Sequence, residues 1–396
     1  MHVPKLKLLV GSWHLLEQKM AFGNPTAGGF KTMAEALSAV SQLNKELKST
    51  YDIELAVSAH WWHELLVPGD DSLFGQSYEW NNPRAIDLAQ WVEGVHAGHY
   101  ARIGRIIPPG FGLPKSDDGA FTNPDPERRK LAHNMMVYSF ETSHAVRLAV
   151  AGEGGVIYWT GPDGIRWLRV VRGDDVLLGH DLNPELEEWK LIIDGVSSAV
   201  AEAKKLGFTE ESDLLIEGKP AGDPCYLDVF TDTALEIRGI QELNERVGPR
   251  QNGSNIVQWQ GEFCHSRGSG QTFHDAMSQT IDAGVFGGRI HLNSGGLGGT
   301  NFAKLLSEPK GSPISLFPQY VDNDYLPGEG LPEWVEDQLN TIRCGAAWSA
   351  NTGLPFEVEF DARFCRYADT IGALQVSAEW VINHFNEAVK SFEVGK

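Results

Sequence analysis

Carboxylate and imidazole side chains recur at short spacings in this chain. Glu262 and His265 lie three positions apart, and Asp322 and Asp324 lie two positions apart. Oxygen ligands with a few imidazole nitrogens suit Mg²⁺, Mn²⁺ or Co²⁺, and the lack of a CxxC pair disfavours structural zinc. A single Glu or His in a loop is more often a solvated surface group. The prediction of a cation site therefore requires that these residues meet at one place.

Glu217 and Lys219 add a carboxylate and an ammonium group within one short segment, Ile216-Glu217-Gly218-Lys219-Pro220. A carboxylate can bridge two cations, and a lysine can donate to a substrate oxygen on which negative charge develops. The segment therefore predicts groups for metal-assisted chemistry on an oxygen-rich substrate.

Short apolar segments alternate along the chain with longer segments of helical spacing. The apolar segments are 6–12, 53–59, 103–107, 155–159, 213–216, 255–259, 288–292 and 356–360. The helical segments are 32–48, 83–97, 125–150, 183–206, 231–247, 272–283, 331–347 and 369–392. This alternation predicts an α/β fold, and the count of strands favours a (β/α)8 TIM barrel over an open doubly wound sheet.

A barrel would collect the residues at its strand exits, because the loops after the strands converge at one face. The residues at these exits are Trp13, His60, Trp159, Glu217, Glu262, His291 and Asp361. The strand interiors are otherwise expected to be apolar. We expect the strand before Glu262 to end near Gln260, so that Glu262 and His265 share one loop, and we place Asp322 and Asp324 in a loop.

The charge balance restricts the partners of the chain. Its 53 acidic and 33 basic side chains give a net charge of −20, which argues against nucleic acids and anionic membrane surfaces. Neutral ligands and cations remain possible. The four cysteines are widely scattered and are interpreted as free thiols in a reducing compartment. No segment resembles a signal peptide or a membrane span, so we expect a cytoplasmic protein.

In combination, these motifs resemble those of the xylose isomerase family and the related L-rhamnose isomerases. Ile216–Pro220 resembles the family's IEPKP, and Glu262 to His265 is similar to its ExxH pair. Phe360-Asp361-Ala362-Arg363 resembles FDAK, and Asp322-x-Asp324 resembles its DxD. His291 stands where xylose isomerases have an aspartate and L-rhamnose isomerases a histidine. His63 stands where the family has the aspartate partner of the histidine at His60.

The resemblance implies a single TIM-barrel domain, 1–396. Two departures from the family are a long loop insertion at about 294–330 and the expected lack of the long C-terminal arm of xylose isomerases. It also implies a metal-dependent aldose–ketose isomerase that acts on an unphosphorylated, neutral sugar by a hydride shift. The first of two divalent cations (Mn²⁺, Mg²⁺ or Co²⁺) would be held by Glu217, Glu262, His291 and Asp361. The second would be held by Glu217, His265, Asp322 and Asp324.

The family's remaining roles fall on five residues. His60 would assist ring opening, and Lys219 would stand beside the reacting oxygens. Trp13 and Trp159 would line the sugar pocket, and Phe22 would reach into a neighbouring subunit of a homo-oligomer, a dimer or tetramer. Two other functions stay open at this point: a metal-dependent sugar epimerase or dehydratase that abstracts a proton, and a non-catalytic sugar-binding barrel.

Overall fold

The computed structural model describes most of the chain, with gaps. The described residues are 2–16, 29–60, 65–66, 85–108, 120–150, 154–159, 187–218, 229–230, 232–268, 270–292, 294–297, 320–360 and 369–394. Within them, the side chains of a few residues next to the gaps are not described, and these are named below where they matter.

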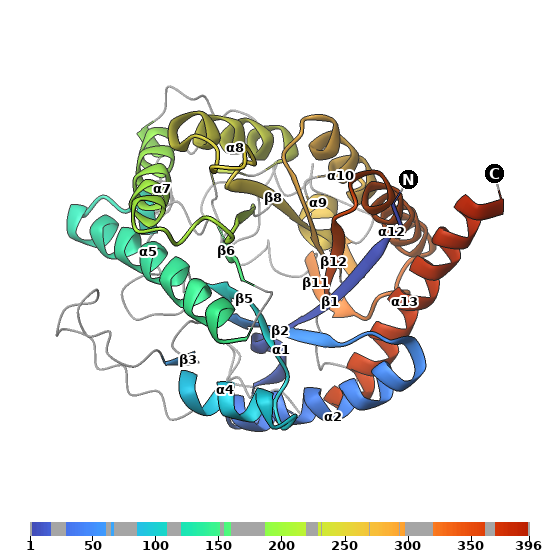
Figure 1. The fold of residues 1–396 in the computed structure, drawn as a ribbon. Helices are drawn as coiled ribbons and strands as arrows, with labels where there is room; N and C mark the ends of the chain where they lie inside the picture. Colours follow the sequence, from blue (N-terminus) through green and yellow to red (C-terminus); the bar gives the residue numbers. More distant parts are fainter. Residues whose placement is uncertain are drawn as a thin grey trace.

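Eight parallel strands form a closed barrel at the centre of the molecule (Figure 1). The strands are β1 (Lys5–Gly11), β2 (Leu55–His60), β5 (Ile103–Ile107), β6 (Val156–Trp159), β7 (Leu214–Glu217), β8 (Val257–Glu262), β9 (Phe286–His291) and β12 (Pro355–Phe360). Their order around the barrel is β1-β12-β9-β8-β7-β6-β5-β2. The closed sheet confirms the predicted barrel and excludes the open doubly wound sheet.

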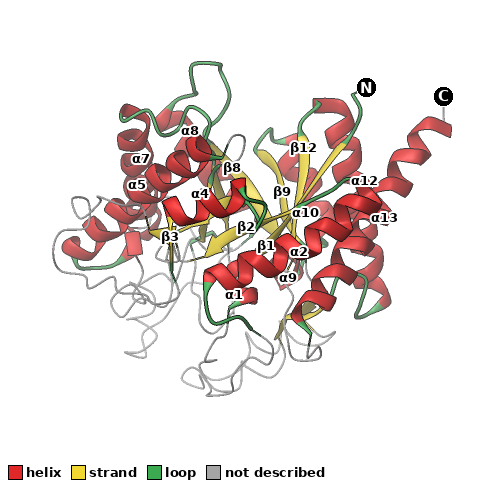
Figure 2. Cartoon of the chain, turned by 60° about the horizontal axis from the view of Figure 1, so that its bottom comes forward, coloured by secondary structure: helices red, strands yellow, loops and turns green. Residues whose placement is uncertain are grey.

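Helices cover the outside of the strands (Figure 2). They are α1 (Ser12–Leu15), α2 (Met33–Tyr51), α4 (Leu88–His96), η2 (Ala120–Thr122), α5 (Pro126–Ala149), α7 (Glu187–Lys205), α8 (Thr233–Val247), α9 (Phe263–Gly268), α10 (Phe273–Asp282), α12 (Pro332–Thr352) and α13 (Thr370–Val394). Capping residues fix several starts. The Asp232 side chain accepts a hydrogen bond from the Leu235 amide at 3.0 Å and thereby caps the start of α8.

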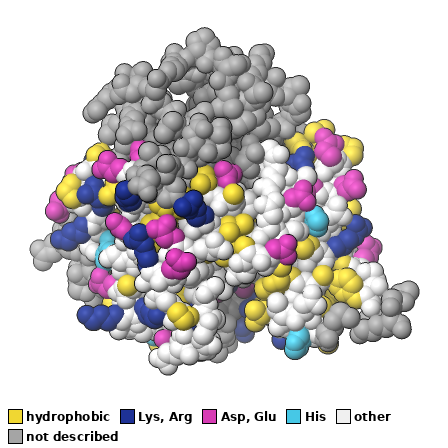
Figure 3. Space-filling model, turned by 90° about the horizontal axis from the view of Figure 1, so that it is seen from above, with side chains coloured by type: hydrophobic (Ala, Val, Ile, Leu, Met, Phe, Trp, Pro, Cys, Tyr) yellow, Lys and Arg dark blue, Asp and Glu magenta, His cyan; other side chains and the backbone are white. Residues whose placement is uncertain are grey.

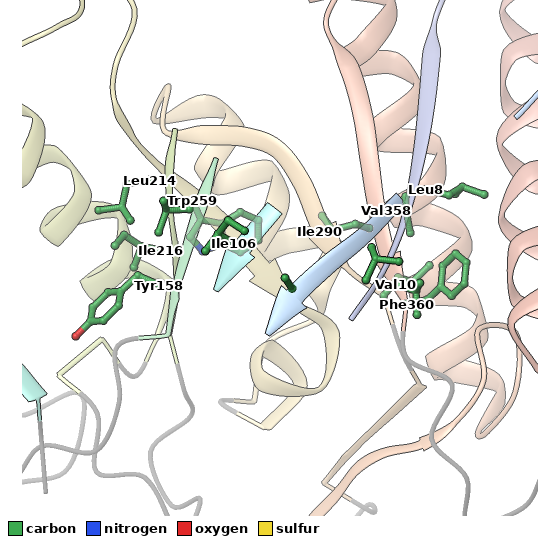
Figure 4. Packing of buried hydrophobic residues seen from close by; sticks show 14 of the residues in the cluster. Leu8, Val10, Ile106, Tyr158, Leu214, Ile216, Trp259, Ile290, Val358 and Phe360 are labelled. Atoms are coloured by element: carbon green, nitrogen blue, oxygen red, sulfur yellow. The ribbon is translucent and has the colours of Figure 1, made fainter. Parts of the chain in front are cut away.

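The main hydrophobic core lies between the barrel and its helices. Side chains of a strand alternate between its two faces, and one set is apolar: Leu8, Val10, Ile106, Tyr158, Leu214, Ile216, Trp259, Ile290, Val358 and Phe360 (Figure 4). These residues are almost fully buried. Their alternating position turns the other set of side chains toward the inside of the barrel.

The inside of the barrel is partly charged, which overturns the expectation of apolar strand interiors. A small apolar cluster of Ile107, Ile157 and Leu215 lies there. In contrast, Arg105 on β5 binds Glu357 on β12 at 2.9 Å, although these strands are not neighbours. The pair therefore crosses the barrel interior. The expectation failed because alternate polar residues within these strands belong to the inward face.

The pair Arg105–Glu357 sets the ionisation of its carboxylate. Burial alone would raise the pKa of Glu357, but the guanidinium groups of Arg105 and Arg289 outweigh burial and lower the pKa below its usual range. The ionised form therefore stabilises the fold above the ordinary pKa of a glutamate. This contribution is lost as the pH falls through the lowered pKa.

Replacing Glu357 with glutamine should remove this pH dependence, because glutamine has the shape of a protonated glutamate but cannot ionise. We expect Glu357→Gln to be less stable than the wild type at neutral pH, and the difference to shrink as the pH falls. Urea unfolding midpoints measured in steps from pH 7 to pH 3 check this. A difference that is constant across the series would contradict the role of the pair.

A two-stranded antiparallel sheet follows the barrel strand β9. It pairs β10 (Ser294–Leu297) with β11 (Tyr320–Tyr325), and both strands pack against α9. Asp322 and Asp324 therefore lie in a strand, which corrects the prediction that they lie in a loop. A second small sheet pairs β3 (Leu65–Leu66) with β4 (Ile86–Asp87).

Acidic and basic side chains are interspersed on the described surface (Figure 3). Within the described residues, no helix combines the length and apolar character that crossing a bilayer requires. Cys264 and Cys344 are free thiols, as expected, and Cys225 and Cys365 lie outside the described residues.

Candidate metal and sugar site

Three neighbouring barrel strands end in predicted metal ligands. Glu217 is the last residue of β7, Glu262 of β8 and His291 of β9. These side chains are buried, with exposed fractions of 1%, 2% and 4%. Glu262 and His291 are in register across the β8–β9 pair. The barrel therefore brings residues from distant parts of the sequence to one edge, as the strand-exit argument predicted.

His265 completes this group from the helix that follows β8. The strand continues through Glu262, and α9 begins at Phe263, so the two residues lie on a strand end and a helix rather than on one loop. The Glu262 side chain accepts a hydrogen bond from the backbone amide of His265. The Nδ1 atom of His265 lies 3.3 Å from Oε2 of Glu262 and 3.7 Å from Oε1 of Glu217. The imidazole is therefore next to both carboxylates.

Gln260 holds the second oxygen of Glu217. Its side-chain amide Nε2 donates a hydrogen bond to Oε2 of Glu217, and Gln260 is fully buried. Motif comparison missed this residue, although it lies two positions before Glu262 on the same inward face of β8. Alternation along Gln258-Trp259-Gln260-Gly261-Glu262 is the signal that would have found it.

Glu236 on α8 fixes the backbone just after Glu217. Its carboxylate accepts a hydrogen bond from the Gly218 amide at 3.1 Å and another from the indole of Trp259. A Cβ atom at position 218 would collide with Glu236 and with the Phe230 carbonyl oxygen. Only glycine at position 218 therefore lets the chain approach the Glu236 carboxylate so closely. Through its two hydrogen bonds, Glu236 links the end of β7 to Trp259 on the outer face of β8.

The other predicted site residues are placed only in part. The backbone of His60 ends β2, that of Trp159 ends β6, and that of Trp13 lies in α1 just after β1. Asp322 and Asp324 lie on β11, next to the helix that carries His265. The side chains of these five residues are not described, and Phe22, His63, Lys219 and Asp361 lie outside the described residues.

The donor chemistry of the described group fits a divalent cation. Two carboxylates and two imidazoles are buried at the ends of three neighbouring strands and on the helix that follows one of them, and these are the ligand types that Mn²⁺, Mg²⁺, Co²⁺ or Zn²⁺ accept. In their present positions, no three His, Cys, Asp or Glu side chains among the described residues are arranged to hold one ion. Asp361 lies outside the described residues, and the side chains of Asp322 and Asp324 are not described.

Comparison with known proteins supports the same type of barrel. No family model matches the chain. The chain is 29% identical over 177 residues to the xylose isomerase of Escherichia coli O139:H28, a match that covers 45% of this chain. The match spans only about a third, 34%, of that relative's length.

Solved structures extend the likeness to almost the whole chain. The IolI protein with a bound zinc atom matches 97% of this chain and 99% of its own, with 12% identity and a TM-score of 0.52. A xylose isomerase-like TIM barrel fused to a 4-hydroxyphenylpyruvate dioxygenase matches 98% of this chain and 44% of its own, with 10% identity and a TM-score of 0.50. The chain has a xylose isomerase-like barrel fold.

In this xylose isomerase-like barrel, the described ligand set lies along one arc, β7-β8-β9, of the strand order. Strand β12, which precedes Asp361, is the next neighbour of β9. The residues predicted for the first cation therefore lie at the ends of four consecutive strands: three of them are the last residues of β7, β8 and β9, and Asp361 directly follows β12. This is the arrangement from which a shared site can form.

Proposed function

We propose that the chain is a metal-dependent aldose–ketose isomerase that acts on an unphosphorylated, neutral sugar by a hydride shift. The observation that carries the proposal is that Glu217, Glu262 and His291 are buried at the ends of three neighbouring barrel strands, with the imidazole of His265 next to both carboxylates. Buried ionisable groups are costly unless they pair or bind a cation, so such a set is typical of a functional site.

In this proposal, Glu217 would serve as a ligand in both of two cation sites. Glu262, His291 and Asp361 would complete the first site, and His265, Asp322 and Asp324 would complete the second. When bound, the cations would polarise the two sugar oxygens between which hydrogen is moved. The notable departure from xylose isomerases is the imidazole of His291, which leaves the identity of the sugar open.

The remaining residues would bind and orient the sugar. His60 exchanges the proton that ring opening requires, and Lys219 donates a hydrogen bond to the oxygen on which negative charge develops. Trp13 and Trp159 place apolar rings against the C–H face of the sugar and exclude water. Phe22 closes the pocket of a neighbouring subunit, so the assembly is proposed to be a homo-oligomer in the cytoplasm.

The similar proteins support this proposal by their names. Relatives that match part of the sequence include the xylose isomerase of Escherichia coli O139:H28, and the IolI structure contains a zinc atom. The first name agrees with a sugar substrate, and the second agrees with a bound divalent metal.

Replacing Lys219 with methionine should lower kcat at least about 100-fold, because the variant loses a positive donor at the developing oxyanion. Binding of Mn²⁺ should be unchanged, since Lys219 is not a proposed ligand. Steady-state kinetics at saturating Mn²⁺ and calorimetric Mn²⁺ titration check the two parts. An unchanged kcat would remove Lys219 from the mechanism.

The reaction itself is tested by a screen of aldoses and ketoses with Mn²⁺, Mg²⁺ and Co²⁺. We expect interconversion of one aldose–ketose pair, detected by chromatography, and its loss after treatment with a chelator. In D₂O, a hydride shift keeps the substrate hydrogen, so the product should carry no solvent deuterium. Solvent deuterium at C2, with one cation per chain, would indicate an epimerase or dehydratase that abstracts a proton. Sugar binding that ignores the chelator, without turnover, would indicate a non-catalytic barrel.

A further inference from the structure

Gln260 occupies a buried position between an acidic and a basic side chain. On one side, it follows the registered pair Ile216–Trp259 by one residue, which places it opposite Glu217 on β7. On the other side, it is in register with Arg289 on β9. Gln260 and Arg289 each have an exposed fraction of 0%. Both point to the inside of the barrel, because they share the inward face with Glu262 and His291.

An amide suits this position because it carries a donor at one end and an acceptor at the other. Its Nε2 donates to Oε2 of Glu217. Its Oε1 atom, and the Nε and Nη1 atoms of Arg289, are buried and have no hydrogen-bond partner among the described residues. A carboxylate on one side requires a donor, and a guanidinium on the other side favours an acceptor. The neighbours therefore determine which way the amide faces.

We propose that Gln260 is a positioning residue that fixes the orientation of the Glu217 carboxylate for cation binding. The inference rests on the metal site of the proposed function. With Oε2 tied to Gln260, Oε1 faces His265, whose Nδ1 lies at 3.7 Å. A carboxylate has about four lone-pair positions, and the hydrogen bond from Gln260 uses one of them. Gln260 thus orients the Glu217 carboxylate through a single hydrogen bond.

Replacing Gln260 with leucine removes the hydrogen bond to Glu217 and keeps a buried side chain of similar size. We expect the Kd of Mn²⁺, measured by calorimetry on chelator-treated protein without sugar, to rise about 10- to 100-fold. At saturating Mn²⁺, kcat should fall while KM for the sugar stays unchanged, because Gln260 does not contact the sugar. The control is Gln258→Leu, the same change two residues earlier on the same face, where the amide binds the Asn255 carbonyl oxygen instead.

A second pair of variants separates orientation from folding. Gln260→Met is unbranched, and should weaken Mn²⁺ binding as Gln260→Leu does. Gln260→Leu should weaken Mn²⁺ binding less than Glu217→Gln does, because it disturbs the orientation of the ligand without removing the ligand. Wild-type Mn²⁺ affinity in both Gln260 variants, or an equal loss in Gln258→Leu, would overturn the role of Gln260 alone. A wild-type protein that binds no Mn²⁺ would overturn the metal site, and with it this inference.

Discussion

Glu217→Gln is expected to abolish both cation binding and turnover. Glutamine keeps the size of the side chain but loses the negative charge that both proposed cations share. Loss of residues that only orient a ligand commonly costs 10- to 100-fold in metal affinity, so loss of the shared ligand itself should cost more than about 100-fold. Calorimetric titration with Mn²⁺ and an isomerase assay on the same sample measure the two effects.

The matched control is Glu187→Gln on α7, where the same change occurs at an exposed position. Its Mn²⁺ affinity and activity should equal those of the wild type. Circular dichroism spectra of both variants should match the wild type, because the Glu217 variant can still hydrogen-bond to the amide of Gln260. Full activity in Glu217→Gln would contradict the assignment of the cation site.

Arg289→Met is expected to lower the free energy of unfolding by about 3–5 kcal/mol, because it leaves a buried carboxylate without its partner charge. Arg289 is fully buried and donates hydrogen bonds from Nη2 to Glu359 and, at 2.9 Å, to Ser58. Burial lowers the pKa of Arg289, and the charge of Glu359 opposes that shift. Chemical unfolding at neutral pH measures the loss.

Two further variants test whether charge, and not packing alone, is responsible. The double variant Arg289→Met, Glu359→Leu should regain most of the lost stability, since replacing both partners by apolar groups is often nearly neutral. Arg246→Met removes an arginine from exposed ion pairs with Asp194 and Glu242, and should cost no more than about 1 kcal/mol. A double variant no more stable than Arg289→Met would show that the guanidinium acts through packing.

The closed barrel could be predicted because its signal is repetitive. Alternating apolar and helical segments are enough to count strands, and the exit of each strand then locates Glu217, Glu262 and His291. The details that failed depend on local context. Whether β8 stops near Gln260 or continues to Glu262 is decided by where α9 begins, and the apolar pattern alone does not show that point.

The charged barrel interior could not be deduced from apolar runs. Glu357 and Glu359 lie in a strand whose alternate residues, Phe356, Val358 and Phe360, already explain its burial. Their partners, Arg105 and Arg289, come from strands far away in the sequence. Only closure of the barrel shows which charges meet. The same holds for Gln260, whose role depends on the register of β8 with its two neighbours.

The most direct test of the account is a crystal structure of the Mn²⁺-soaked protein, with anomalous diffraction used to locate the metal. Anomalous peaks are expected at the barrel mouth, within coordination distance of Glu217, Glu262, His265 and His291. Saturating Mn²⁺ with no peak near these side chains, or Mn²⁺ bound only elsewhere on the molecule, would contradict it.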